Sequence, residues 1–126
     1  MITAIVSVLL IAHGLLHLAI WAVPARAGQS PPFDPGDSWA LAAAGASVPS
    51  MRVAATAAAS VTTVLYLIAG AAAAAHSGGW GPAAVMAAAS GLLLKGLWFH
   101  PWLSFGVVLD AGVITAVALN WPASLY

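Results

Sequence analysis

The sequence predicts an all-α membrane protein, a four-transmembrane-helix bundle with a short interfacial helix in its first loop. Of the 126 residues, 63% are hydrophobic and 5% are charged, and the mean hydropathy is +1.01. A water-soluble domain carries about 25% charged residues, so this chain has too few polar side chains to cover a soluble fold. The chain contains four long apolar runs, and segments with proline and glycine separate them.

The four apolar runs have the length that a bilayer requires. A helix rises ~1.5 Å per residue, so about 20 residues cross a hydrocarbon core of ~30 Å. We expect one transmembrane domain, residues 1–126, with spans at residues 2–23, 50–75, 82–99 and 102–121. The short connections after the second and third spans make neighbouring helices antiparallel.

The first span has an alternative interpretation as a secretory signal peptide. After Pro24, residues 25–27 read Ala-Arg-Ala, which has the small-x-small form of a signal-peptidase site. However, the N-terminal region has no basic residue, and the apolar run exceeds the usual ~7–15 residues and contains two histidines. We therefore expect residues 1–27 to be retained as a span, with cleavage as the alternative.

The loop at residues 24–49 is the one long connection. Its Pro-Pro-Phe-Asp-Pro-Gly segment is typical of turns. Asp37 or Ser38 can then cap a short helix at residues 39–46, in which Trp39 suits the membrane interface. Loops longer than about a dozen residues are often lids over a site. We favour a plain interfacial connector and keep a lid as the alternative.

Two histidines in the first span form the centre of the candidate site. His13 and His17 are four residues apart, so they share one face of a helix. Imidazoles are costly in hydrocarbon, and this face should therefore meet protein or water. Asp110 lies at similar depth in the fourth span and is the expected partner. Lys95 is a possible second partner, although its favoured interpretation is a side chain that extends to the membrane interface.

The same residues allow several kinds of site. A structural polar cluster is one; a proton, cation or small-ligand site is another. Histidines at this spacing can also bind one face of a zinc or copper ion, with Asp110, His100 and His76 as the available further ligands. The run between His13 and His17 lacks the glutamate of a zinc protease. Haem would need a histidine from a second helix, and no other span has one near its middle.

The second span carries a weakly polar stripe. Thr56, Ser60, Thr63 and Gly70 fall on roughly one side of the helix. Small residues let helices approach closely in lipid, and hydroxyls bond across the interface. We interpret the stripe as a packing seam, to which Tyr66 adds one hydrogen bond.

Tryptophans at the predicted span ends indicate an aromatic belt, and we assign Trp80, Trp98, Trp102 and Trp121 to it. The basic residues favour one orientation. In a four-span topology Arg26, Arg52 and Lys95 lie on the same side, which the positive-inside rule assigns to the cytoplasm, with both termini outside. Because the chain has three basic residues in all, this orientation is an expectation.

In overall form the sequence resembles small four-span membrane proteins of bacteria with GC-rich genomes, through its span count and the His-Gly-x-x-His run at residues 13–17. The resemblance implies a multi-pass protein of a bacterial inner membrane. The expected partners are the lipid bilayer and other membrane subunits or a second copy. Nucleic acid is excluded by a net charge of zero with three basic residues. The absence of cysteine excludes disulfides and thiolate chemistry.

The leading hypothesis is a non-enzymatic membrane protein, an accessory subunit or small carrier component. Its buried site of His13, His17 and Asp110 would bind a proton, a cation or a small ligand. The alternative is a membrane-embedded enzyme that acts on a lipid or quinone, with a histidine as general base oriented by Asp110. That enzyme needs a lateral opening and a ligand-sized cavity beside His13. The third hypothesis is a metal- or haem-binding protein.

Overall fold

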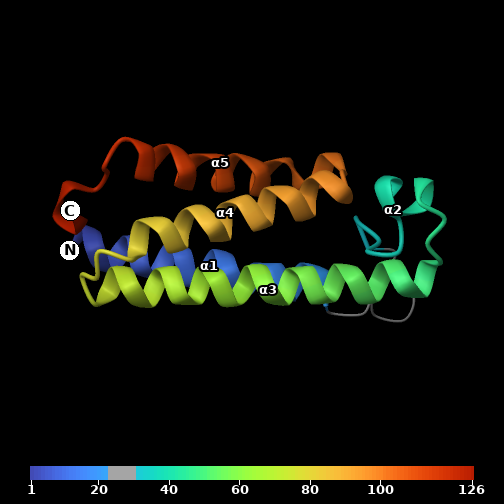
Figure 1. Ribbon diagram of the computed structural model, residues 1–126, viewed down its shortest axis with the longest axis horizontal. Helices are drawn as coiled ribbons and strands as arrows, with labels where there is room; N and C mark the ends of the chain where they lie inside the picture. The colour runs from blue at the N-terminus through green and yellow to red at the C-terminus, as the bar shows by residue number, and fades with distance from the viewer. Residues whose placement is uncertain (23–30) are drawn as a thin grey trace.

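The computed structural model describes residues 1–22 and 31–126, and every regular element in that part of the chain is helical. Four long helices lie side by side: α1 (Ile2–Trp21), α3 (Val48–Ala74), α4 (Trp80–Leu97) and α5 (Ser104–Ala118) (Figure 1). A single 3-10 turn, η1 (Pro101–Leu103), precedes α5. Within the described residues α1, α3, α4 and the continuous segment of η1 and α5 (Pro101–Ala118) are long and apolar enough to cross a membrane, which confirms the predicted fold class.

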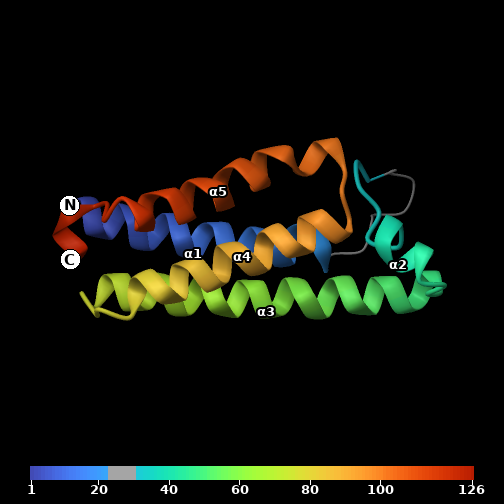
Figure 2. The ribbon, with the colours of Figure 1, turned by 45° about the horizontal axis from the view of Figure 1, so that its top comes forward.

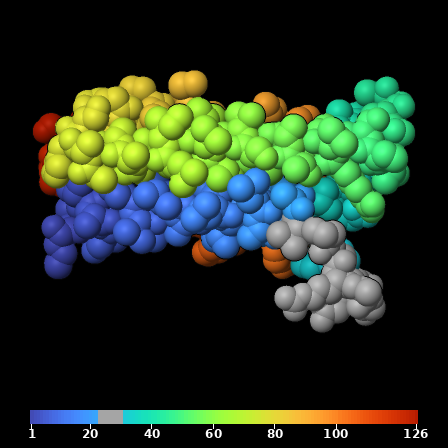
Figure 3. Space-filling view, turned by 90° about the horizontal axis from the view of Figure 1, so that it is seen from below, coloured from blue at the N-terminus to red at the C-terminus, as the bar shows by residue number. Residues whose placement is uncertain are grey.

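Both termini lie at one end of the bundle, and the short helix α2 (Trp39–Ala43) lies at the other (Figures 1 and 2). Helices α3 and α4 each begin two residues before the expected starts of the second and third spans. The proposed cleavage tripeptide and Arg26 lie outside the described residues. The helix α1 packs along α3, and the two cover one face of the molecule (Figure 3).

Two glycines bring α1 and α3 into close contact. A Cβ atom on Gly14 would lie 2.6 Å from the Tyr66 Cβ, and one on Gly70 would lie 2.6 Å from the Ile11 Cγ1. The Thr63 hydroxyl donates a hydrogen bond of 2.8 Å to the Gly14 carbonyl oxygen across this contact. The expected packing seam is therefore confirmed for Thr63 and Gly70.

The other half of the predicted stripe does not take part in this seam. Thr56 is exposed, and the Ser60 hydroxyl donates to the Thr56 carbonyl oxygen of its own helix at 2.8 Å. An internal bond of this kind satisfies a hydroxyl without any partner helix. Of the predicted stripe, the residues beyond Ser60 therefore form the seam.

Helix packing leaves an opening on one side of the bundle. Helix α1 packs on α3, α3 packs on α4 and α4 packs on α5, whereas α1 and α5 make few direct contacts. Within α5 the single buried residue is Asp110. The attachment of α5 therefore combines its contact with α4 and one buried carboxylate.

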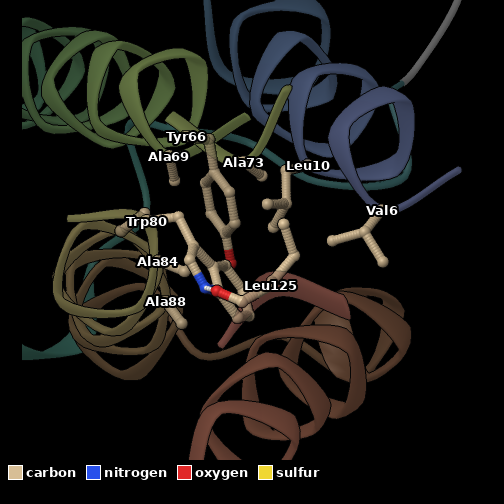
Figure 4. Packing of buried hydrophobic residues seen from close by; sticks show 10 residues of the cluster. Val6, Leu10, Tyr66, Ala69, Ala73, Trp80, Ala84, Ala88 and Leu125 are labelled. Carbon is tan, nitrogen blue, oxygen red and sulfur yellow. Dashed lines mark hydrogen bonds between the residues drawn. The ribbon is translucent and has the colours of Figure 1, made fainter. Parts of the chain in front are cut away.

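Two apolar clusters fill the bundle on either side of its centre. The cluster nearer the termini contains Tyr66, Trp80 and Leu125 among small and aliphatic residues, as Figure 4 shows. The cluster nearer the long loop contains Trp21, Phe33, Ala55, Ala59, Leu94, Trp98 and Leu103. Alanines contribute much of the first cluster, which lets the helices approach closely.

The predicted aromatic belt is correct for two of its four tryptophans. Trp102 and Trp121 are half-exposed at helix ends, as a belt requires. Trp80 and Trp98 are buried instead, because their indole N–H groups find backbone acceptors inside the protein. They donate to the Leu125 carbonyl oxygen at 3.2 Å and to the Pro35 carbonyl oxygen at 2.8 Å.

The long loop supplies hydrogen-bond donors to the end of α4. Of the two predicted capping residues, Ser38 is the N-cap of α2 and accepts from the Leu41 N–H. The Ser38 hydroxyl also donates to the Leu97 carbonyl oxygen at 2.7 Å, and the Trp39 indole donates to the Gly96 carbonyl oxygen at 2.7 Å. The last carbonyl groups of a helix have no partner within it, so these bonds fasten the loop to α4.

Left-handed residues follow three of the helices. Gly45, His76 and Asn120 have φ angles of 78°, 50° and 52°. In each case the next residue's N–H bonds back to the last turn, which is a Schellman cap. This geometry ends α2 at Ala43, earlier than the expected residue 46, and it ends α5 at Ala118, before the expected Trp121.

An exposed ion pair lies where the loop meets the start of α3. The Asp34 carboxylate accepts from the Gly36 N–H at 2.8 Å and from the Arg52 guanidinium at 3.2 Å. The Gly36 hydrogen bond holds the pKa of the Asp34 carboxyl below its usual value. Because the pair is exposed, we expect it to contribute at most about 1 kcal/mol.

The close contact between α1 and α3 predicts a large effect of one methyl group. Gly14→Ala places a Cβ against Tyr66, so the helices must separate, and we expect a loss of about 1–3 kcal/mol. Thermal unfolding in detergent, followed by circular dichroism, measures it. Gly112→Ala in α5 is the control, since nothing lies within 4 Å of its added Cβ. Equal stability of Gly14→Ala and the control would contradict the packing argument.

Candidate functional site

The candidate site is built around the Asp110 carboxylate of α5, which has no solvent exposure. Its Oδ1 atom accepts hydrogen bonds from the Tyr66 hydroxyl at 2.6 Å and from the His13 Nε2 at 2.7 Å. Its Oδ2 atom accepts from the Lys95 Nζ at 2.8 Å. Three donors, one of them the Lys95 ammonium, favour an ionised carboxylate, because that form only accepts hydrogen bonds and balances the positive charge. All four long helices therefore meet at this group.

Lys95 is the counter-charge of the cluster. Besides Asp110, its Nζ contacts the His17 Nε2 at 2.8 Å and the Gly91 carbonyl oxygen at 3.4 Å. An ammonium group has three protons to donate, and the three acceptors match them. The favoured expectation that Lys95 extends to the membrane interface is therefore wrong: its side chain is 5% exposed and points toward the bundle centre, where its acceptors lie.

Two further glycines make room for this ion pair. A Cβ atom on Gly91 of α4 would collide with the Asp110 carboxylate, and one on Gly106 of α5 would lie 2.5 Å from the Lys95 Cε. Each glycine therefore gives space to a charged side chain of the facing helix. The close approach of α4 and α5 and the burial of the pair depend on the same two positions.

The hydrogen bonds assign the tautomers of both histidines. The His17 Nε2 accepts from Lys95, so its Nδ1 carries the proton and donates to the His13 carbonyl oxygen at 3.0 Å. His13 donates through Nε2 to the Asp110 carboxylate, and in the neutral imidazole its Nδ1 is then a lone-pair acceptor. That Nδ1 is the one buried side-chain nitrogen or oxygen among the described residues without a hydrogen-bond partner. An unsatisfied buried acceptor costs about 1–3 kcal/mol.

Cavities in the opening between α1 and α5 reach this cluster. One has a volume of about 430 Å³ and is lined by His13, His17 and Lys95 together with apolar residues, extending to Trp102. The other, about 510 Å³, extends from His13 to Trp121 and has almost entirely apolar walls. His13 lines both. The described loop residues line neither cavity, which favours the connector interpretation over the lid.

The structure thus brings together four predicted site residues and separates two others. His13, His17, Lys95 and Asp110 form one hydrogen-bonded cluster. His100 lies before η1, where its Nδ1 accepts from the Trp102 N–H at 3.2 Å. His76 ends α3 near the termini. Among the described residues, neither histidine belongs to the group of possible ligands at the cluster.

The cluster contains a possible set of metal ligands, but the ammonium group of Lys95 already binds two of them. One ligand atom each from His13, His17 and Asp110 lie within 4.8 Å of one another. However, the Lys95 ammonium contacts His17 Nε2 and Asp110 Oδ2, both at 2.8 Å. A metal ion that used these two atoms would have to displace Lys95. The predicted metal role of His13 and His17 therefore competes with an internal ion pair.

Tyr66 is the member of the cluster that sequence reasoning undervalued. It was expected to add only a hydrogen bond to a packing seam, whereas it donates directly to Asp110. The available signal was its position, three residues after Thr63 and four before Gly70 on the same helical face. A tyrosine on a seam of small residues has its hydroxyl directed into the bundle.

Comparisons with known proteins add no family to this description. No protein-family model matches the chain, and neither a curated protein nor a solved structure is detectably similar to it. The cluster and its cavities are therefore the features of the molecule that bear on its function.

The buried ion pair predicts non-additive mutations. Lys95→Met and Asp110→Leu each leave one buried charge without its partner, so we expect each to cost about 3–5 kcal/mol. The double variant removes both charges and should cost much less than the sum of the two. Denaturant unfolding of all four proteins in mixed micelles measures this coupling. Additive single effects would contradict the ion pair.

Removal of the lysine also predicts a new metal site. In Lys95→Ala the atoms of His17 and Asp110 are freed, and Zn²⁺ can replace the lost positive charge. We expect Zn²⁺ to raise the melting temperature of Lys95→Ala by several degrees and to leave that of the wild type unchanged. The matched controls are Lys95→Ala/His17→Ala, which should lose the effect, and Lys95→Ala/His100→Ala, which should keep it. Equal stabilisation of the wild type would show that Lys95 does not block the site.

Proposed function

We propose that this chain is a small, non-enzymatic membrane protein that binds a neutral, lipid-soluble molecule at the His13–Asp110 cluster. The ligand enters from the bilayer between α1 and α5. The observation that carries the proposal is a partly open cavity beside His13 at the level of the buried polar cluster. Cavity volumes of about 430 and 510 Å³ fall in the range of small-molecule sites, roughly 300–1,000 Å³.

Charge and depth both favour a neutral ligand. The ammonium of Lys95 and the carboxylate of Asp110 pair with each other, so the cluster offers no unpaired charge to a charged head group. A charged group near the bilayer centre costs several kcal/mol. The cavity walls are mostly apolar and suit a hydrocarbon tail or ring system. Long-chain alcohols, phenols, quinone-type molecules and sterol-like molecules satisfy these conditions.

Such a protein would act as a carrier component or an accessory subunit in a bacterial inner membrane. An association with other membrane subunits or a second copy is supported by α5, because Asp110 is its single buried residue and the rest of the helix is open to lipid or to a partner. The orientation with both termini outside is supported by Arg52, an exposed basic residue at the long-loop end. Lys95 gives it no support, since that charge is buried and paired.

A membrane-embedded enzyme is the second candidate, and one specific observation favours it. Asp110 holds the His13 imidazole through Nε2 at 2.7 Å and leaves Nδ1 free. A carboxylate that orients an imidazole and leaves its other nitrogen unbonded is typical of a histidine general base, although the nitrogens are exchanged here, since the carboxylate of a serine-protease triad holds Nδ1. The lateral opening that such an enzyme needs is also present. Chemical change of the bound molecule distinguishes the enzyme from the binding protein.

The binding proposal predicts that a larger side chain in the opening blocks the site. With the protein in lipid nanodiscs, we expect saturable binding of 4-octylphenol by isothermal titration calorimetry. Leu109→Trp, which fills the region shared by both cavities, should weaken it at least roughly tenfold. Leu93→Trp is the control, because this exposed α4 residue lines neither cavity.

Two outcomes would contradict this proposal. Uptake of the phenol no different from that of empty nanodiscs would remove the binding site. Equal weakening by Leu109→Trp and Leu93→Trp would place the bound molecule outside the opening. Mass spectrometry of the recovered phenol tests the second candidate, since an unchanged molecule supports binding without catalysis of that probe.

A further inference from the structure

We propose that the ligand's polar group is a hydroxyl, and that it donates a hydrogen bond to the Nδ1 atom of His13. This inference rests on the proposed function and specifies the chemical class of the ligand. Alcohols, phenols and hydroquinones belong to that class. Ethers, ketones, esters and quinones, which offer acceptors alone, do not.

The donors of the cluster are already committed to the protein. The Tyr66 hydroxyl and the His13 Nε2–H both bond to Asp110. The His17 Nδ1–H bonds to a backbone carbonyl oxygen, and Lys95 donates to three acceptors. A ligand carbonyl would therefore have to break one of these bonds to find a donor. The loosest is the 3.4 Å contact of Lys95 with the Gly91 carbonyl oxygen, and that oxygen would then lose its side-chain donor.

The unmet hydrogen-bonding capacity is an acceptor. Asp110 and the His17 Nε2 already accept hydrogen bonds, whereas the His13 Nδ1 accepts none. A nitrogen lone pair buried without a donor is rare and costly, and it points to a group that completes the site. A hydroxyl supplies the missing donor, because its single proton can form one hydrogen bond to Nδ1.

The position of His13 suits this role. Its side chain is 12% exposed and lines both cavities, whereas Asp110 has no exposed surface and lines neither. A ligand in the opening therefore contacts the His13 ring, and the Nδ1 atom, which is buried in the unliganded protein, becomes accessible when the ligand binds. The two cavities extend from His13 toward Trp102 and toward Trp121, so a hydroxyl here leaves apolar space for a tail on either side.

A matched set of probes tests the inference. The phenol 4-octylphenol has the donor, 4-octylanisole replaces its proton with a methyl group, and octylbenzene has no oxygen. A hydrogen bond to an otherwise unsatisfied buried acceptor predicts that the phenol binds about tenfold tighter than either other probe to the wild type in nanodiscs. Octylbenzene separates the loss of the hydrogen-bond donor from the added bulk of the anisole methyl group, because it lacks the donor and is smaller than the phenol. If methyl bulk were the cause, octylbenzene would bind as tightly as the phenol, and the inference would be wrong.

The variant His13→Phe removes the acceptor and keeps an aromatic ring, so we expect the phenol and the anisole to bind it equally. A measurement that needs no variant covers the case in which His13→Phe does not fold. With ¹⁵N-labelled histidine in the wild type, the Nδ1 resonance of His13 should shift on addition of the phenol and not of the anisole. An unchanged resonance at saturating phenol would overturn the inference.

The outcomes separate the inference from the function on which it rests. If none of the three probes binds saturably, the proposed function fails. If all three bind saturably and equally, the opening binds lipid-soluble molecules and the hydroxyl assignment is wrong. A preference for the phenol that persists in His13→Phe would place the acceptor at another residue, and it would also overturn the assignment.

Discussion

The buried ion pair between Lys95 and Asp110 is the interaction on which the rest of the bundle depends. Moving two charges out of water costs several kcal/mol each, and their attraction compensates only when the remaining hydrogen bonds are satisfied. The structure meets that condition with Tyr66, His13 and His17. Every long helix therefore contributes to keeping one carboxylate ionised. The polar side chains specify which helix faces meet. Apolar contacts specify them less well, because lipid tails are as apolar as the side chains of the helices.

The same constraint explains the unusual exposure of α5. This helix buries Asp110 and little else, so its position depends on a polar anchor as well as on its contact with α4. Because α5 contacts α1 only weakly, the apolar opening between them persists beside the anchor. The site and the opening thus have one origin in how the fourth span is attached.

The fold was predictable from the sequence because hydrophobic length and helix-breaking residues act locally. The meeting of His13 with Asp110 followed from depth alone, since both lie near the middle of their spans. The burial of Lys95 was not predictable in this way. A lysine near a helix end extends outward by default, and only the space at Gly106 and the acceptors Asp110 and His17, on α5 and α1, make the inward direction favourable. Tyr66 was undervalued for the same reason, because its acceptor lies on another helix.

Because the opening between α1 and α5 faces the bilayer, the concentration that governs binding to this protein is the concentration of the ligand in the membrane. A lateral opening in a membrane is always filled, so lipid acyl chains compete with any other molecule for the space beside His13. Occupancy then depends on the mole fraction of the ligand in the bilayer and on how well the host chains pack against α1 and α5, rather than on an aqueous concentration. The surrounding membrane therefore sets the apparent affinity as directly as the side chains do.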